Sequence, residues 1–484
     1  MTVNTMGGQW PDYLNSTEFI VGMLDMQSTL AHLEERLLVN GIVEAGQGEE
    51  APRMQLLGHR LQRAEALIAE YEAGHEDLIM PMDAAWVISC ATLVFLMQLG
   101  FAQLEAGMCR PKNVIATYIK NIADFVLGTQ ATLFIGYAIA YSQVPLFEKI
   151  DAWKFFFHLV FQATASTIVS GAMAERINII GYIFLTCFLS GFVYAFSVKL
   201  AWGGGFLDTG IDPPFHDFAG SGVVHLLGGS AALAGTIVLG ARQDRWTMPE
   251  KFVCHSVPQV LSGALLLWVG WYGFNPGSTG QMSTVEDGRL ASNAAMTTTI
   301  GGATAGCVAL IYDLVISEGQ HIEIHKFVNS ILGGLVSVTA GADTLTPWTS
   351  ILTGIVAFAV CQSAEQQIVA HRIDDVVSAI PVHGACGAWG CIAVGLFKPS
   401  GGLFYGYGFW LLGTQIVGVI TIFLLGFVPI YGLCKLLHLY GYLRASEEEE
   451  AMGLDQYLFK ECAYADEPED TSNNSFSYSI ADPG

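Results

Sequence analysis

Charge is scarce in this sequence. Only 13% of its 484 residues are charged, whereas 52% are hydrophobic, and soluble proteins carry about 25% charged residues. A lipid bilayer is therefore the solvent that suits this chain. The formal net charge of −23 comes mainly from the two termini, including Glu447 to Glu450, and not from the apolar body. Net charge consequently says little about a substrate.

The sequence also lacks the motifs of nucleic-acid binding, metal binding and catalysis. There is no basic patch with interleaved aromatic residues, which argues against nucleic acid as a partner. The ten cysteines fall mostly inside apolar runs, as Cys90, Cys187 and Cys391 do, without the spacing of a metal site or a disulfide framework. No nucleophile with a base and no phosphate-binding loop occurs in the polar parts. The sequence thus predicts no enzyme activity, no cofactor and no metal.

The N-terminal region, residues 1–82, is polar and acidic and lacks the pattern of a cleaved signal peptide. Apolar residues at Leu57, Leu61, Ala64 and Tyr71 recur at spacings near three and four, which predicts an amphipathic helix or a short coiled coil. The alternative is a solvated helical tail with no function of its own. Asn15 begins a glycosylation sequon that matters only if this tail is extracytosolic and the host glycosylates it.

What the sequence does contain is a series of apolar segments between residues 83 and 443. Each is close to the roughly 20 residues that a helix needs to cross the hydrocarbon layer. We count eleven, at about 84–107, 114–142, 153–174, 178–200, 217–240, 252–275, 290–315, 327–346, 349–370, 376–397 and 405–441. Because eleven is odd, the two termini are expected on opposite sides of the membrane. The first membrane helix would itself direct insertion.

The distribution of basic residues among the loops indicates whether the N-terminus lies inside or outside. With the N-terminus outside, eleven basic residues fall on the inner side and five on the outer side. The inner set is Arg110, Lys112, Arg176, Arg242, Arg245, Lys251, Lys326, Arg372, Lys435, Arg444 and Lys460, and the outer set is Lys149, Lys154, Lys199, Arg289 and Lys398. This asymmetry favours an outer N-terminus and a cytosolic tail, residues 444–484.

The fifth and tenth segments share a pattern built around a histidine. His225 and His383 each follow an aspartate by eight residues and precede a glycine by four. The flanking residues are Asp217 and Gly229 in the fifth segment and Asp375 and Gly387 in the tenth. Helices five apart in order run in opposite directions, as in an inverted repeat with a site at its interface. The predicted architecture is therefore a five-plus-five inverted repeat followed by one long final helix.

A histidine deep inside a membrane helix is costly, because its ring must find a partner or water. Two histidines at matching positions therefore form a candidate site, although each could instead be satisfied by neighbouring backbone. A zinc site would need further ligands beside them, and the sequence has none there.

Five motifs in the body carry a resemblance to a known family. They are LEAG at 104–107, GAMAER at 171–176, DFAGSGVVH at 217–225, WYGFNPGS at 271–278 and VHG at 382–384. In order and spacing, residues 84–464 resemble the ammonium transporter family in its Amt branch. The resemblance implies a homotrimer in the plasma membrane, with one pore per subunit and His225 and His383 in the middle of that pore.

The same resemblance implies roles for further residues. Phe157, Trp202 and Ser278 would recruit ammonium at an outer vestibule by cation–π and hydrogen-bond contacts. Phe161 and Phe274 would stack below them as a gate. For these phenylalanines, packing in the core or against lipid is the alternative. Two residues would support the site structurally and electrostatically, namely Asp217, which could equally cap its helix, and Trp271.

The implied activity is transport of ammonium, with methylammonium as an analogue. A bare cation is costly in an apolar pore, but ammonium can release its proton and cross as ammonia between imidazoles that titrate near neutral pH. We expect net movement of charge. The alternatives are an ammonium sensor with little flux and an electroneutral channel of the Rh type.

Two positions depart from the family pattern. Ser378 occupies a position where many members carry an aspartate, and Phe459-Lys460 replaces the usual His-Gly of the regulatory tail. Coupling between subunits through this tail is therefore in doubt.

Overall fold

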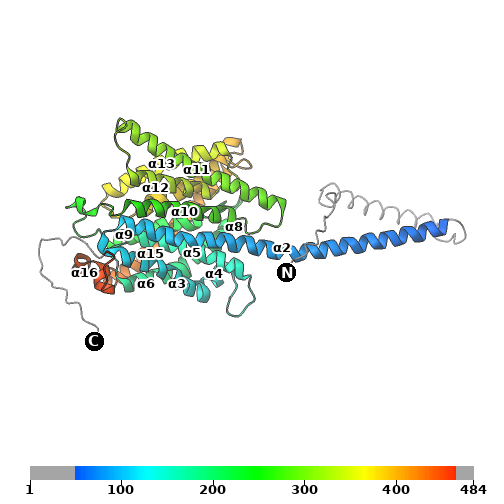
Figure 1. Cartoon of the computed structure of the whole chain (residues 1–484), viewed down its shortest axis with the longest axis horizontal. Coiled ribbons are helices and arrows are strands. Elements are labelled where there is room, and N and C mark those ends of the chain that lie inside the picture. The colour runs from blue at the N-terminus through cyan, green and yellow to red at the C-terminus, as the bar shows by residue number, and fades with distance from the viewer. Residues whose placement is uncertain (1–49, 465–484) are drawn as a thin grey trace, which may run out of the picture. The chain divides into compact units, whose positions relative to one another are not determined.

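The computed structural model describes residues 50–464, and this part of the chain is helical (Figure 1). Within it, the β-type pairing consists of one isolated bridge between Ile177 and Arg444. The expectation of an all-α protein is therefore confirmed. The chain divides into two units, Met1–Leu78 and Ile79–Gly484. The sequon at Asn15 lies outside the described residues.

The described part of the first unit, residues 50–78, is helical, as the spacing of its apolar residues predicts. It belongs to α2, which spans Glu50–Met108. The location of this segment outside the cytosol stays a prediction.

The second unit is a bundle of helices. After α2 the main elements are α3 (Val114–Ala131), η4 (Thr132–Gly136), α4 (Tyr137–Tyr141), α5 (Ala152–Ala172), α6 (Ile179–Phe188), η5 (Leu189–Val193), α7 (Tyr194–Ala201), α8 (Phe206–Thr209), η6 (Ser221–Leu226), α9 (Leu227–Leu239), α10 (Val257–Gly277), α11 (Val285–Ile316), α12 (Ile324–Thr339), α13 (Pro347–Ala370), η8 (Ile380–Ala385), α14 (Cys386–Phe397) and α15 (Trp410–Leu439). The tail adds α16 (Glu447–Met452) and η10 (Asp455–Phe459).

Ten helices within residues 50–464 are long and apolar enough to cross a membrane. They correspond to ten of the eleven predicted segments. The remaining one, 327–346, coincides with α12, which has 16 residues. At 1.5 Å per residue such a helix measures about 24 Å, less than the roughly 30 Å hydrocarbon layer. The count of eleven crossings thus stays a prediction.

α12 ends early because another segment binds its last turn. The Ser221 hydroxyl donates to the Val336 carbonyl at 2.7 Å and accepts from the Ala340 amide at 2.6 Å. The Phe218 amide donates to the Ala340 carbonyl at 2.9 Å. These bonds satisfy backbone groups at the end of the helix that would otherwise lack partners. α12 therefore stops inside the bundle, against the segment that leads into the first histidine helix.

Both histidine helices begin with a π-helical stretch capped by an aspartate. The Asp217 carboxylate accepts from the amides of Gly220, Gly222 and Val223 at 2.8–3.0 Å, just before and within η6. Asp375 does the same for η8, accepting from the amides of Val377 at 3.3 Å and Ile380 at 2.7 Å. Capping, one of the two roles left open for Asp217, is therefore what its carboxylate performs here. The matched construction is what an inverted repeat predicts.

Two glycines let the histidine helices pack closely. A Cβ atom on Gly229 would run into the backbone of Gly384, next to His383. A Cβ atom on Gly387 would lie 2.5 Å from the Ser221 carbonyl oxygen and 2.8 Å from the Leu226 amide nitrogen. Because a real Cβ tolerates neither distance, each glycine is required where one histidine segment meets the other.

The Gly229→Ala substitution should lower stability by about 1–3 kcal/mol, because the added methyl group overpacks a contact between two backbones that cannot shift independently. The measurement is the apparent melting temperature of the purified protein in detergent. Gly413→Ala is the matched control, since a Cβ atom on that helical glycine of α15 would meet nothing within 4 Å. Equal melting temperatures for the two variants would contradict the assigned packing.

Candidate functional site

The two predicted histidines lie side by side. The Nδ1 atoms of His225 and His383 are 3.2 Å apart, and the rings stack with centroids 5.2 Å apart at an interplanar angle of 16°. Both side chains are buried. In this hydrogen bond one Nδ1 must donate and the other accept. The Nε2 atom of His225 has no partner within the described part of the chain.

The predicted aromatic residues pack around this pair. Phe161 and Phe274 stack at a centroid distance of 3.9 Å and an angle of 12°, and the Phe274 ring is 5.4 Å from the His225 ring. Trp271 stacks on His225 as well, with ring centroids 5.3 Å apart at 15°. Its indole N–H donates to the Thr339 hydroxyl at 3.1 Å, which fixes the plane of the tryptophan.

Beyond the phenylalanines lies a cavity of about 570 Å³, which we call the outer cavity because the loop charges place it on the predicted outer side. Phe157, Phe161, Trp202 and Ser278 all line it. The Ser278 hydroxyl donates to the Phe274 carbonyl at 2.8 Å and keeps lone pairs free. The Trp202 indole N–H donates to the Asp217 carbonyl at 2.8 Å. All three residues predicted for recruitment thus border one cavity.

A second, much smaller cavity of about 20 Å³ adjoins His383. Its lining includes Phe101, Leu104, Glu105 and Thr167 and is otherwise largely aliphatic. Phe101 was not predicted, although its ring lies 6.0 Å from that of His383. The outer cavity, the phenylalanine pair, the histidine pair and this inner cavity form one series through the bundle.

The outer cavity also contains residues that the sequence reasoning missed. They are Tyr137, Tyr141, His158 and Tyr194. His158 lies in an apolar segment, so the rule that singled out His225 and His383 applies to it as well. The tyrosines come from other helices, and no spacing in the sequence connects them to His158.

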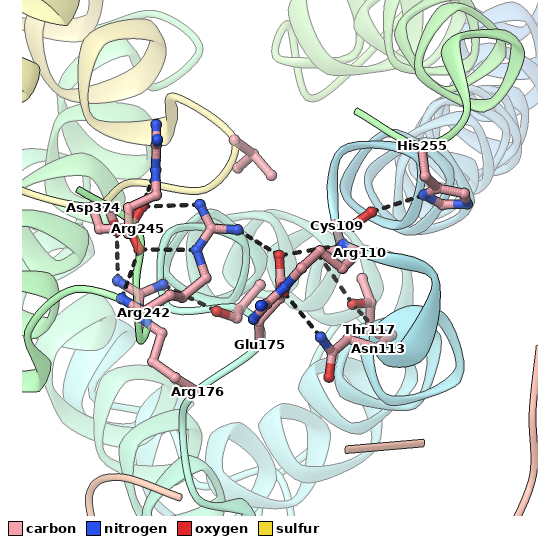
Figure 2. Close-up of polar contacts among 12 residues, drawn as sticks. Cys109, Arg110, Asn113, Thr117, Glu175, Arg176, Arg242, Arg245, His255 and Asp374 are labelled. Carbon is pink, nitrogen blue, oxygen red and sulfur yellow. Dashed lines mark hydrogen bonds and ion pairs between the residues drawn. The ribbon is translucent and has the colours of Figure 1, made fainter. Parts of the chain in front are cut away.

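At the opposite end of the bundle, four charged side chains and an amide form a buried cluster around Glu175 (Figure 2). Glu175 pairs with Arg110 and Arg242 and accepts from the Asn113 amide at 2.9 Å. Arg242 continues to Asp374 with two bonds of 2.8 and 2.9 Å. Four loops of the predicted inner side are held together by these contacts.

Burial alone would raise the pKa of the Glu175 carboxyl, but the guanidinium groups of Arg242 and Arg110 outweigh it and hold that pKa below its usual range. The pKa of Asp374 is likewise lowered, against the effect of burial, by Arg176 and Arg242.

The C-terminal tail binds to the same end. Glu450 accepts from the Gln243 amide at 2.6 Å and from Arg444 at 2.7 Å. Asp455 accepts from the first amides of α3, those of Ile115 at 2.9 Å and Ala116 at 2.8 Å. The Leu454 amide donates to Asn113 at 2.9 Å, and Asn113 in turn donates to Glu175. One side chain thus connects the tail to the charged cluster.

Comparison with known proteins decides the family. The model of the Ammonium Transporter Family matches residues 85–464. The chain belongs to the ammonium transporter family. It is therefore a multi-pass membrane protein, and the resemblance found in the sequence is confirmed.

Individual relatives agree with this membership. The chain is 34% identical over 415 residues to ammonium transporter Amt2 of Archaeoglobus fulgidus, covering 78% of this chain and 86% of that protein. It is 34% identical over 455 residues to ammonium transporter 1 member 3 of Solanum lycopersicum, covering 84% and 97%. Among solved structures, one titled a sensor Amt protein matches with a TM-score of 0.71 and 31% identity, covering 79% of this chain and all of that one.

The Glu175→Gln substitution should lower the free energy of unfolding by roughly 3–5 kcal/mol at neutral pH, because it leaves buried guanidinium groups without their carboxylate. The pKa of Glu175 is depressed on folding, so its stabilisation is complete above the unfolded value of about 4.3. It is lost as the pH falls through the lower folded value. The gap in melting temperature between the variant and the unchanged protein should therefore narrow below about pH 4.

Glu286→Gln is the control for this experiment. Glu286 pairs with Arg289 at 3.5 Å on the surface, where both side chains are more than half exposed. Such a pair contributes about 0–1 kcal/mol. A Glu175 variant as stable as the Glu286 variant at pH 7 would show that the cluster does not hold these loops.

Proposed function

We propose that this protein conducts ammonium across a membrane as ammonia, between His225 and His383. The observation that carries the proposal is the position of the histidine pair. It is enclosed between an aromatic outer cavity and a small inner cavity whose mostly aliphatic lining also includes Glu105 and Thr167, behind two stacked phenylalanines.

Recruitment takes place in the outer cavity. The faces of Trp202 and Phe157 attract a cation by their ring quadrupoles, and the free lone pairs of the Ser278 hydroxyl accept an N–H group. Sodium and potassium also bind ring faces and hydroxyl oxygens, so the outer cavity concentrates cations and the selection among them falls to the barrier below it.

The stacked rings of Phe161 and Phe274 form the barrier. An unpaired charge in such a place costs many kcal/mol, which excludes metal cations. Ammonium can instead transfer a proton to solvent water in the outer cavity and pass as neutral ammonia. Ammonia then reaches the imidazoles, whose shared Nδ1 bond fixes both rings with the Nε2 edge of His225 unpaired. That edge can hydrogen-bond ammonia in either tautomer.

Net movement of charge accompanies this passage if the released proton crosses as well, and a pair of hydrogen-bonded imidazoles is suited to relay it. Two rival functions differ in a measurable way. An Rh-type channel would move ammonia without current. A sensor would bind ammonium with little flux. The similarity to a structure titled a sensor Amt protein is the reason to test this alternative.

We further propose that the protein lies in the plasma membrane as a homotrimer, with its N-terminus outside. The charged cluster supports the orientation, because Arg110, Arg176 and Arg242 gather at one end together with the tail. Basic residues concentrate on the cytosolic side of membrane proteins. Large apolar side chains exposed on α3, α11 and α15 provide surfaces for lipid and for neighbouring subunits.

Replacing His225 or His383 with alanine should reduce ammonium-evoked current at least about tenfold or abolish its selectivity over potassium, because the passing molecule loses a hydrogen-bond partner in an apolar pore. The protein would be reconstituted in liposomes on a supported membrane, and current would be recorded in ammonium gradients. His438→Ala is the control, since His438 is exposed at the end of α15. Unchanged current and selectivity in both pore variants would disprove the mechanism.

Growth of a yeast that lacks its own ammonium transporters separates the rivals. Rescue on low ammonium supports transport, whereas methylammonium binding without rescue or uptake supports a sensor. Uptake of methylammonium without ammonium-evoked current supports the electroneutral channel.

A further inference from the structure

Three tyrosines surround a buried histidine in the wall of the outer cavity. The ring of His158 lies 5.5 Å from Tyr137, 5.3 Å from Tyr141 and 5.2 Å from Tyr194, at interplanar angles of 89°, 71° and 53°. All four residues line the cavity that also holds Trp202 and Ser278. We call these four residues the tyrosine–histidine group.

The polar atoms of this group have no protein partners. His158 is only 4% exposed, and its Nε2 atom is enclosed without a hydrogen bond. Within residues 50–464, no hydrogen bond joins its Nδ1 atom or the three phenol hydroxyls to another residue. A buried polar atom without a partner is destabilising. The three phenol hydroxyls and the second ring nitrogen of His158 thus lie in the wall of one cavity without a protein partner, and they are free to bind an occupant.

Of the two ring nitrogens of His158, Nε2 is the enclosed one, which leaves Nδ1 as the nitrogen that is available to the cavity. Tyr137 and Tyr141 stand nearly perpendicular to the imidazole, an arrangement in which an N–H can point at an aromatic face. An Nε2–H group can be accommodated in this way. The lone pair then resides on Nδ1, which is an acceptor for a donor in the cavity.

The backbone is adapted at this site. π-helical turns are rare and occur frequently at functional sites. Here η4 ends at Gly136, immediately before Tyr137, and η5 ends at Val193, immediately before Tyr194. The two turns also approach each other, since a Cβ atom on Gly136 would lie 3.1 Å from the Ser190 carbonyl oxygen. Two of the three tyrosines, Tyr137 and Tyr194, thus directly follow π-helical turns that pack against each other.

The rim of the cavity does not by itself attract cations. It carries Lys149, Lys154 and Asp151, and Asp151 is paired with Lys154 at 2.8 Å. Selection of a cation inside must therefore come from ring faces and lone pairs. These are what the tyrosine–histidine group supplies.

We infer that His158, Tyr137, Tyr141 and Tyr194 form a second binding site for a small protonated amine, beside the one proposed at Trp202, Phe157 and Ser278. The amine donates one N–H to His158 Nδ1 and others to the phenol oxygens, while the tyrosine rings stabilise its charge. The cavity of about 570 Å³ has room for two such ions with water, since a water molecule occupies about 30 Å³. This site rests on the proposed function, because it would hold a waiting ammonium ion next to the gate.

The test replaces His158 by phenylalanine, which keeps a ring but removes the acceptor, and by glutamine, which keeps an acceptor. Methylammonium is titrated against the full-length protein in detergent by calorimetry, and ammonium-evoked current is recorded in liposomes. For His158→Phe the half-saturating concentration should rise about tenfold with maximal current unchanged, as expected for one lost hydrogen bond to a charged group. Tyr141→Phe should shift it in the same direction, and His158→Gln should stay close to the original value.

Tyr312→Phe is the matched control, because Tyr312 is an exposed tyrosine of α11 outside the cavity. A half-saturating concentration that is the same in His158→Phe as in this control would overturn the second site. So would a fall in maximal current and melting temperature with unchanged half-saturation, which is the mark of a purely structural histidine.

Failure of the transport function would look different. A protein that binds methylammonium but passes no current would refute conduction, and the calorimetric comparison of His158→Phe with the unchanged protein would still decide the site. Weaker binding in the variant would support it, and equal binding would overturn it.

Discussion

The hydrogen bond between the Nδ1 atoms of His225 and His383 is the interaction on which the rest of the site depends. It forms at 3.2 Å because two capped π-helical segments bring their histidines side by side. Gly229 and Gly387 then allow the backbones to meet without an intervening Cβ. With the two imidazole rings held nearly parallel, Trp271 stacks on His225, and the Phe274 ring lies tilted beside it at a centroid distance of 5.4 Å. The aromatic side chains of the site are therefore packed outward from the histidine pair.

The aspartates before the histidines hold the histidine helices in place by accepting hydrogen bonds from backbone amides. The Asp217 carboxylate is occupied by three amides, and the carbonyl of the same residue accepts from the indole of Trp202. One residue thus joins the start of the histidine helix to an aromatic wall of the outer cavity. The Asp217 carboxylate is thus bonded to the start of the helix, and Asp217 is not among the residues that line the outer cavity.

The polar side chains at the two ends of the bundle differ in whether they have protein partners. At the predicted inner end, carboxylates and guanidinium groups neutralise one another in a buried cluster that also binds the tail through Asn113. At the outer end, polar groups in the cavity wall are left without protein partners. Paired charges suit loops that must be held in place, whereas unpaired acceptors suit a surface that receives a donor.

The sequence by itself determined the class of protein, because twenty-residue apolar segments leave a chain few alternatives in water or lipid. It also predicted the pair His225 and His383, since a matching aspartate and glycine flank each one. Only the tertiary structure decided that α12 is shorter than its segment, because Ser221 and Phe218 bind its last turn from a distant part of the chain. The stacking of Phe161 on Phe274 and the enclosure of His158 by tyrosines of other helices were decided in the same way. Hydropathy and spacing report how one helix meets lipid, whereas these contacts depend on how several helices pack against one another.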